Sequence, residues 1–119
     1  MLFRSQLVLA AQLRGANTTD LDARLELVGL ASRRDHLPTQ LSGGEQQRLA
    51  VAAAVVGNPS IVLCDEPTAE LDNTSGRHLL VAVEQLASAG TTFIIASHDP
   101  EVRGISNMVV ELAFGVVVR

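Results

Sequence analysis

Lysine is absent from this sequence of 119 residues, and its basic charge comes entirely from nine arginines. Any mechanism that needs a lysine within these residues is therefore excluded, including a phosphate-binding loop of the pattern G-x-x-x-x-G-K-[ST]. Acidic residues outnumber basic ones, and the formal net charge is −4. A general nucleic-acid binder shows a basic patch or stripe, so this balance argues against nucleic acid as a partner.

Cysteine is nearly absent as well, since Cys64 is the single one and an internal disulfide is excluded. Because Cys64 lies in a short apolar run, we expect a buried strand residue in a reducing compartment. Long apolar runs are also lacking, and no transmembrane segment is expected. Near the N-terminus, Gln6 and Gln12 interrupt the apolar stretch, which favours an amphipathic helix over a signal peptide.

The hydrophobic pattern that is present predicts an α/β fold. Continuous apolar runs at residues 61–64 and 92–96 suit strands that are buried on both faces. A helix is expected between them, over about residues 75–88, with Gly90 as its C-cap. Strand, helix and strand in this order imply a crossover connection and a parallel sheet.

The two ends of the chain add smaller elements to this core. Helices are expected at about residues 5–13 and from Thr19 to Gly29, followed by a loop at residues 32–40. At the other end, Asp99 and Pro100 predict the start of a helix, as an N-cap and a first helical residue. Two closing strands, at residues 108–112 and 116–118, are expected to join around Gly115.

A glycine pair within Ser42-Gly43-Gly44-Glu45 precedes an Ala- and Val-rich helix that is expected to run to about Val56. Ser42 and Glu45 can form a capping box. The free N–H groups and partial positive charge of a helix N-terminus suit a phosphate, and the glycines allow a ligand to approach the backbone closely. A plain capped helix after a glycine turn is the other interpretation of this tetrapeptide.

Both predicted strands deliver polar side chains to one sheet edge, where ligands bind in open α/β folds. Asp65 and Glu66 follow the first strand, and His98 follows the second. There Asp65 could hold Mg²⁺, Glu66 could orient and activate an attacking water, and His98 could donate a hydrogen bond to a phosphate oxygen. Taken singly, these residues are also explained as a solvated strand end and an exposed loop histidine.

Together, the order and spacing of these motifs resemble the C-terminal half of the ATP-binding subunit of an ABC transporter. The run L-S-G-G-E-Q-Q-R from Leu41 is followed by D-E-P-T from Asp65, A-E-L-D from Ala69 and S-H-D-P from Ser97. The resemblance covers essentially the whole chain. It implies a partial P-loop NTPase domain of the ABC type over residues 1–119, with part of a helical subdomain at about 1–40 and the motifs and closing strands at 41–119.

The resemblance also implies a role for each matching residue. Asp65 matches the Walker B metal-site aspartate, Glu66 the catalytic glutamate and His98 the switch histidine. Asp72 ends the match to the D-loop, which runs along the dimer interface in the family. The family's signature contacts the γ-phosphate of ATP held by the opposite subunit, and its four matching residues are Ser42, Gly43, Gly44 and Glu45.

The family works with ATP and Mg²⁺, so these are the cofactors that the resemblance implies. The implied partners are a second ATP-binding domain and a membrane permease, with the chain in the cytoplasm at the inner or plasma membrane. The motif run is most similar to exporters of the lipoprotein-release and macrolide-efflux group. The glycine-rich Walker A motif is absent, so this chain alone is expected to be marginally folded and not to hydrolyse ATP.

The chain departs from the family's pattern at Ala53, where many members carry arginine, and at residues 113–115, where Ala-Phe-Gly replaces a polar turn. Two other functions stay open. One is a non-transport relative, such as a DNA-repair ATPase with a coiled coil between its halves, although residues 1–40 show no sustained heptads. The other is a catalytically silent half-domain or binding module that contributes only its signature face to another subunit.

Overall fold

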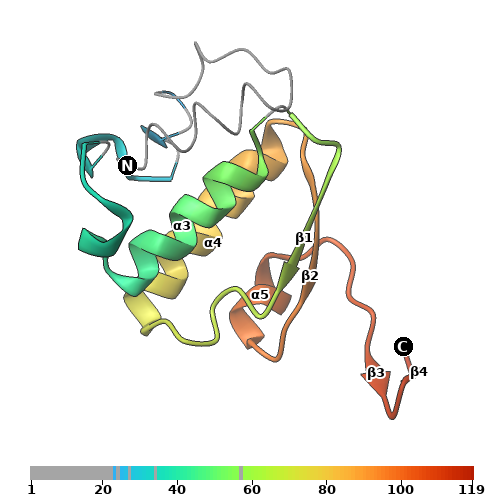
Figure 1. Ribbon diagram of the computed structural model, residues 1–119. Coiled ribbons are helices and arrows are strands. Elements are labelled where there is room, and N and C mark those ends of the chain that lie inside the picture. Colours follow the sequence, from blue (N-terminus) through green and yellow to red (C-terminus); the bar gives the residue numbers. More distant parts are fainter. Residues whose placement is uncertain (1–22, 24, 27, 34, 57) are drawn as a thin grey trace.

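The computed structural model describes residues 23, 25–26, 28–33, 35–56 and 58–119 of the chain, and the predicted α/β order is confirmed there (Figure 1). Two helices flank the first strand, and a third helix and a small hairpin follow the second. The elements are α3 Gly43–Ala54, β1 Ile61–Asp65, α4 Asn73–Ser88, β2 Thr92–Ala96, α5 Pro100–Ile105, β3 Leu112–Ala113 and β4 Val116–Val117.

The strands β1 and β2 pair in parallel, as predicted, and α4 connects them. Ile61 lies opposite Thr92 at the start of the pair, and Asp65 lies opposite Ala96 at its end. The first residues of the two strands pair with each other, and so do the last, so both strands end at the same edge of the sheet. The residues that directly follow each strand are therefore neighbours in space.

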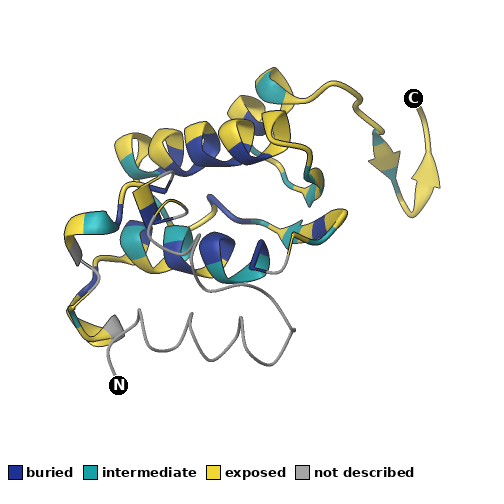
Figure 2. Ribbon diagram, turned by 90° about the horizontal axis from the view of Figure 1, so that it is seen from above, coloured by how far each residue is buried: buried dark blue, intermediate teal, exposed yellow. Residues whose placement is uncertain are grey.

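The prediction that both strands are buried on two faces is wrong. Side chains alternate along β1, where Val62 is 6% exposed and Leu63 is 76% exposed, and along β2, where Ile94 is 56% exposed. In the described part of the chain, helices cover one face of the sheet, and buried residues line the inward sides of these helices (Figure 2). Cys64 is only half-buried on this covered face, and burial raises the pKa of its thiol.

The helices α3 and α4 lie side by side and provide half of the buried core residues (Figure 1). α3 ends at Ala54, two residues before the expected end, and α4 begins at Asn73, two residues before the expected start. Gly90 follows the C-cap residue Ala89 instead of being the cap itself. Its φ of 115° is one that glycine adopts without strain. The side chains that fill the core from α3 and α4 are Leu49, Val51, Ala52, Leu79, Ala82, Val83 and Leu86.

The C-terminal hairpin is shorter than predicted and stands apart from the helices and the parallel strands (Figure 1). Leu112 pairs with Val117, and Ala113 pairs with Val116. The turn between them has φ values of 51° at Phe114 and 76° at Gly115. Positive φ at both central residues is the requirement of a type I′ hairpin turn, so the unusual Ala-Phe-Gly sequence still closes the hairpin.

The segment before α3 differs from the expected loop. It contains two short 3₁₀ turns, η2 (Ala31–Arg33) and η3 (Pro38–Gln40). The helix expected at residues 5–13 lies outside the described residues, and the next one is described only near its predicted end, where Gly29 has a φ of 75°. None of the helices within the described residues is long and apolar enough to span a membrane.

Candidate functional site

The edge where β1 and β2 end brings Glu66 and His98 into direct contact. The distance between Glu66 Oε1 and His98 Nδ1 is 2.6 Å. An ionised carboxylate only accepts hydrogen bonds, so the Nδ1–H of His98 donates to Glu66. The His98 side chain is 99% exposed and that of Glu66 is 36% exposed. The imidazole therefore lies in solvent, hydrogen-bonded to the carboxylate of Glu66.

The backbone of Glu66 contributes to this contact. Its N–H donates to the carbonyl oxygen of Ala96 at 2.8 Å, which continues the pairing one residue beyond β1. Its φ of 46° lies in the left-handed region, where a residue with a Cβ is disfavoured by about 1–2 kcal/mol. Such conformations persist where the surroundings determine them and are concentrated at functional sites.

Asp65 precedes Glu66 and ends β1 with an exposed side chain. Within the described residues, no group of three or more His, Cys, Asp or Glu side chains could enclose a metal ion. Mg²⁺ is commonly held by one or two carboxylates, with water and substrate phosphates completing its octahedron. A single exposed carboxylate therefore fits a magnesium ion that arrives with a nucleotide, and does not fit a resident metal site.

A second contact joins the segment that follows Glu66 to the segment that follows His98. The hydroxyl of Thr68 donates to Asp99 Oδ2 at 2.7 Å. Asp99 is the predicted N-cap of α5, and its Oδ1 accepts the N–H of Glu101 at 2.9 Å. The hydrogen bond from Thr68 is the main cause that lowers the pKa of Asp99, followed by that from Glu101. Asp99 is thus held in its ionised form.

The predicted capping box at the start of α3 is confirmed. Ser42 Oγ accepts the N–H of Glu45 at 3.1 Å, and Glu45 Oε1 accepts the N–H of Ser42 at 3.1 Å. Ser42 and Gly43 are exposed, whereas Gly44 is buried. This helix end therefore combines an exposed, positively polarised backbone with side chains that are already engaged in capping.

Gly44 is buried because it packs on the first turn of α4. A Cβ placed on Gly44 would lie 2.7 Å from the Cβ of Ser75, closer than real Cβ atoms approach. Asp72 caps α4 by accepting the N–H of Ser75 at 2.8 Å, and the hydrogen bonds from Ser75 lower the pKa of Asp72. The start of α3 and the segment that ends at Asp72 are thus joined through Ser75.

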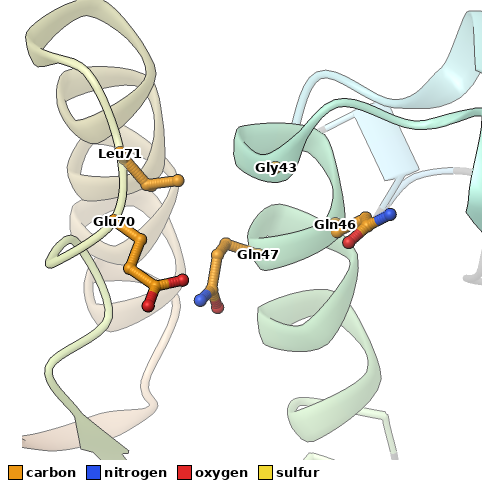
Figure 3. A pocket seen from close by; sticks show the side chains of 5 residues that line it. All are labelled: Gly43, Gln46, Gln47, Glu70 and Leu71. Carbon is orange, nitrogen blue, oxygen red and sulfur yellow. The ribbon is translucent and has the colours of Figure 1, made fainter.

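A depression of about 330 Å³ lies between α3 and the segment before α4 (Figure 3). Gln47 and Glu70 extend into it from opposite sides, while Gln46 projects from α3 away from Glu70 (Figure 3). Gly43 and Leu71 complete the lining. This depression thus lies between polar side chains of the two segments.

The structure thus arranges the sequence-predicted residues in two groups. Glu66 and His98 meet beside Asp65, whereas Gly44 packs against the α4 turn that Asp72 caps. No role was predicted from the sequence for Thr68 or Ser75, which join these segments, and Asp99 was predicted only as a helix N-cap. The cap-forming position of Asp99 was readable from Asp-Pro, but the contacts made by Thr68 and Ser75 carry no local sequence signal.

The ABC transporter family model matches residues 3–69 of the chain. The macrolide export ATP-binding/permease protein MacB of Bradyrhizobium diazoefficiens is 48% identical over 105 residues, which cover 88% of this chain and 16% of that protein. The pyoverdine export ATP-binding/permease protein PvdT of Pseudomonas fluorescens is 42% identical over 97 residues, which cover 82% of this chain and 15% of that protein. The chain thus spans 15–16% of the length of these curated relatives.

Solved cassettes of ABC transporters share the fold. The dimeric structure of MJ0796, a bacterial ABC transporter cassette, has a TM-score of 0.70 and 33% identity, and the match covers 86% of this chain and 45% of that one. The ADP conformation of MJ1267, an ATP-binding cassette, has a TM-score of 0.78 over 85% of this chain and 40% of that one. At 24% identity, this second likeness supports the fold alone.

Proposed function

This chain belongs to the ABC transporter family, and we propose that it forms the signature-bearing part of an ATP-binding domain that energises export through a membrane permease. The motif run and the identity to export proteins support an exporter of the macrolide-efflux kind. The domain would then lie in the cytoplasm, attached to the membrane through its permease. Its second partner is another ATP-binding domain, since the similar MJ0796 cassette is dimeric.

The contact between Glu66 and His98 is the observation that carries this proposal. In the proposed reaction Glu66 is the general base, which orients a water and accepts its proton as the water attacks the γ-phosphate. His98 holds Glu66 in place at 2.6 Å and stands exposed where a phosphate oxygen could reach its ring. The pairing of a base with an orienting imidazole is an arrangement typical of hydrolytic sites.

We assign the nucleotide contacts to the two remaining sets of residues. Asp65 would hold Mg²⁺, which neutralises charge on the phosphates as it develops. Asp72, at the start of α4, would face the partner domain along the dimer interface. The exposed start of α3 would contact the γ-phosphate of ATP bound to the opposite subunit, through Ser42, Gly43, Gly44 and Glu45.

This chain alone is proposed not to hydrolyse ATP. Phosphoryl transfer depends on a loop that cradles the phosphates and on a lysine that grips them, and the sequence contains no lysine. The phosphate-binding loop must therefore come from residues other than these 119. The chain supplies the base, the histidine and the signature end of α3.

The substitution Glu66→Gln tests this assignment in a complete ATP-binding domain that contains these residues. It removes the base and keeps the size and one hydrogen-bond acceptor, so ATP binding should persist. Hydrolysis should fall by about 10²-fold or more, and the ATP-bound dimer should accumulate. Phosphate release and sedimentation velocity with ATP measure the two effects.

Glu84→Gln is the matched control. This substitution makes the same chemical change as Glu66→Gln, but at an exposed position on α4 away from the sheet edge. This variant should hydrolyse ATP at the wild-type rate. An unchanged rate for Glu66→Gln would remove Glu66 from the catalytic role.

A further inference from the structure

Thr68 is the only buried polar side chain among the buried residues that the structure describes, with 7% of its surface exposed. A buried hydroxyl requires a hydrogen-bond partner, and the hydroxyl of Thr68 donates to the carboxylate of Asp99, 31 positions further along the chain. Its methyl group faces α4, with Cγ2 3.9 Å from the position that a Cβ on Gly76 would take. Thr68 is thus fixed on one side by α4 and on the other by Asp99.

The hydrogen bonds of Asp99 also restrain the backbone of its neighbour His98. One carboxylate oxygen accepts from Thr68 and the other from the N–H of Glu101, while the N–H of Asp99 itself donates to Ser97 Oγ at 3.0 Å. The residues on both sides of His98 therefore take part in one network of hydrogen bonds. His98 has an almost fully exposed ring, so packing does not orient it, and its position depends on its hydrogen bond to Glu66 and on its backbone.

We propose that Thr68 is a positioning residue: its hydrogen bond to Asp99 holds the segment that carries His98 against the segment that carries Glu66. This inference rests on the proposed function, since it concerns the same sheet edge. Two contacts then connect the loops, Thr68 to Asp99 at 2.7 Å and Glu66 to His98 at 2.6 Å. A carboxylate is the acceptor in both contacts, but the first is partly buried whereas the second is exposed, so water competes less with the first.

The test uses ATP hydrolysis by a complete ATP-binding domain that contains these residues. Thr68→Val keeps the shape of the side chain and its methyl contact with α4 but removes the hydroxyl. We expect kcat to fall about tenfold or more and KM for ATP to stay within about twofold of wild type. Thr68→Ser restores the hydroxyl and should recover most of kcat. Thermal unfolding of each variant verifies that it is folded.

Three results would overturn the inference: wild-type kcat in Thr68→Val, equal losses in Thr68→Val and Thr68→Ser, or a loss confined to KM. If Thr68→Val does not fold, Thr68→Ala replaces it, because alanine also removes the hydroxyl and adds no second methyl group. Its kcat should fall with KM unchanged, and wild-type kcat would again overturn the inference.

Glu66→Gln, measured alongside, separates this inference from the proposed function. If Glu66→Gln hydrolyses ATP normally, the proposed function itself fails. If Glu66→Gln is inactive while Thr68→Val behaves as wild type, only the positioning role of Thr68 fails.

Discussion

Two aspartates, Asp72 and Asp99, combine a structural role with a position beside the candidate site. Each caps a helix, α4 or α5, and each accepts hydrogen bonds that lower its pKa. In Asp72 the causes are the side chain and backbone of Ser75, and in Asp99 the leading cause is the hydroxyl of Thr68. The ionised forms of both carboxylates are therefore favoured in the folded chain.

This predicts acid sensitivity of the fold. A carboxylate whose pKa is lower in the folded than in the unfolded chain stabilises the fold fully above the unfolded value, about pH 4. That contribution is lost as the pH falls through the folded value. The denaturant midpoint should therefore drop between about pH 5 and pH 2.5. Asp72→Asn and Asp99→Asn should each reduce this dependence, and an unchanged pH profile in both variants would contradict the explanation.

The packing of α3 against α4 connects the two helix starts on which the proposed nucleotide contacts depend. Gly44 sits against Ser75 with no room for a side chain, whereas Gly43 has open space around its missing Cβ. Adjacent glycines thus differ in their structural role. Gly44 serves the contact between helices, and Gly43 leaves the exposed start of α3 uncovered.

This difference gives a matched pair of substitutions. Gly44→Ala should lower the free energy of unfolding by about 1–3 kcal/mol, because the new methyl group collides with Ser75. Gly43→Ala should leave the free energy of unfolding unchanged or raise it slightly. Ser75→Gly should rescue Gly44→Ala, so that the double variant loses less than the sum of the single losses. Denaturant unfolding measures all four proteins, and additive losses would contradict this contact.

The starts of α3 and α5 were predictable because their signals are local. Ser42 with Glu45, and Asp99 with Pro100, specify caps within three residues of each other. The burial of the strands was not predictable, since an apolar run such as residues 61–64 does not reveal which face the helices cover. The bond from Thr68 to Asp99 likewise depends on tertiary structure, because 31 positions separate the two residues.

Considered as a whole, the described chain has a one-sided core. The face of the sheet away from α3 and α4 exposes Ile61, Leu63 and Ile94, and the C-terminal hairpin exposes Phe114 and Val116. A sheet of two strands is only marginally stable in water without further packing. Exposed strand edges and apolar faces of this kind promote association between chains.

We therefore predict that the purified chain alone melts over a broad temperature range and associates through this apolar face. Leu63→Thr should reduce binding of a hydrophobic dye and self-association, with little loss of stability because Leu63 is already exposed. Leu79→Ala, at a fully buried position, should instead destabilise the chain by about 2–5 kcal/mol. A sharp, cooperative melt of a monomer would contradict the prediction.

The most direct test of the account is whether ATP brings this chain to an intact ATP-binding subunit of the macrolide-export kind. Sedimentation velocity should detect a complex with ATP and Mg²⁺ and none with ADP. Ser42→Asp should abolish the complex while the chain stays folded, because aspartate also caps helices but places a negative charge at the proposed γ-phosphate contact. Equal association with and without ATP, or a normal complex with Ser42→Asp, would contradict the proposed role of the α3 start.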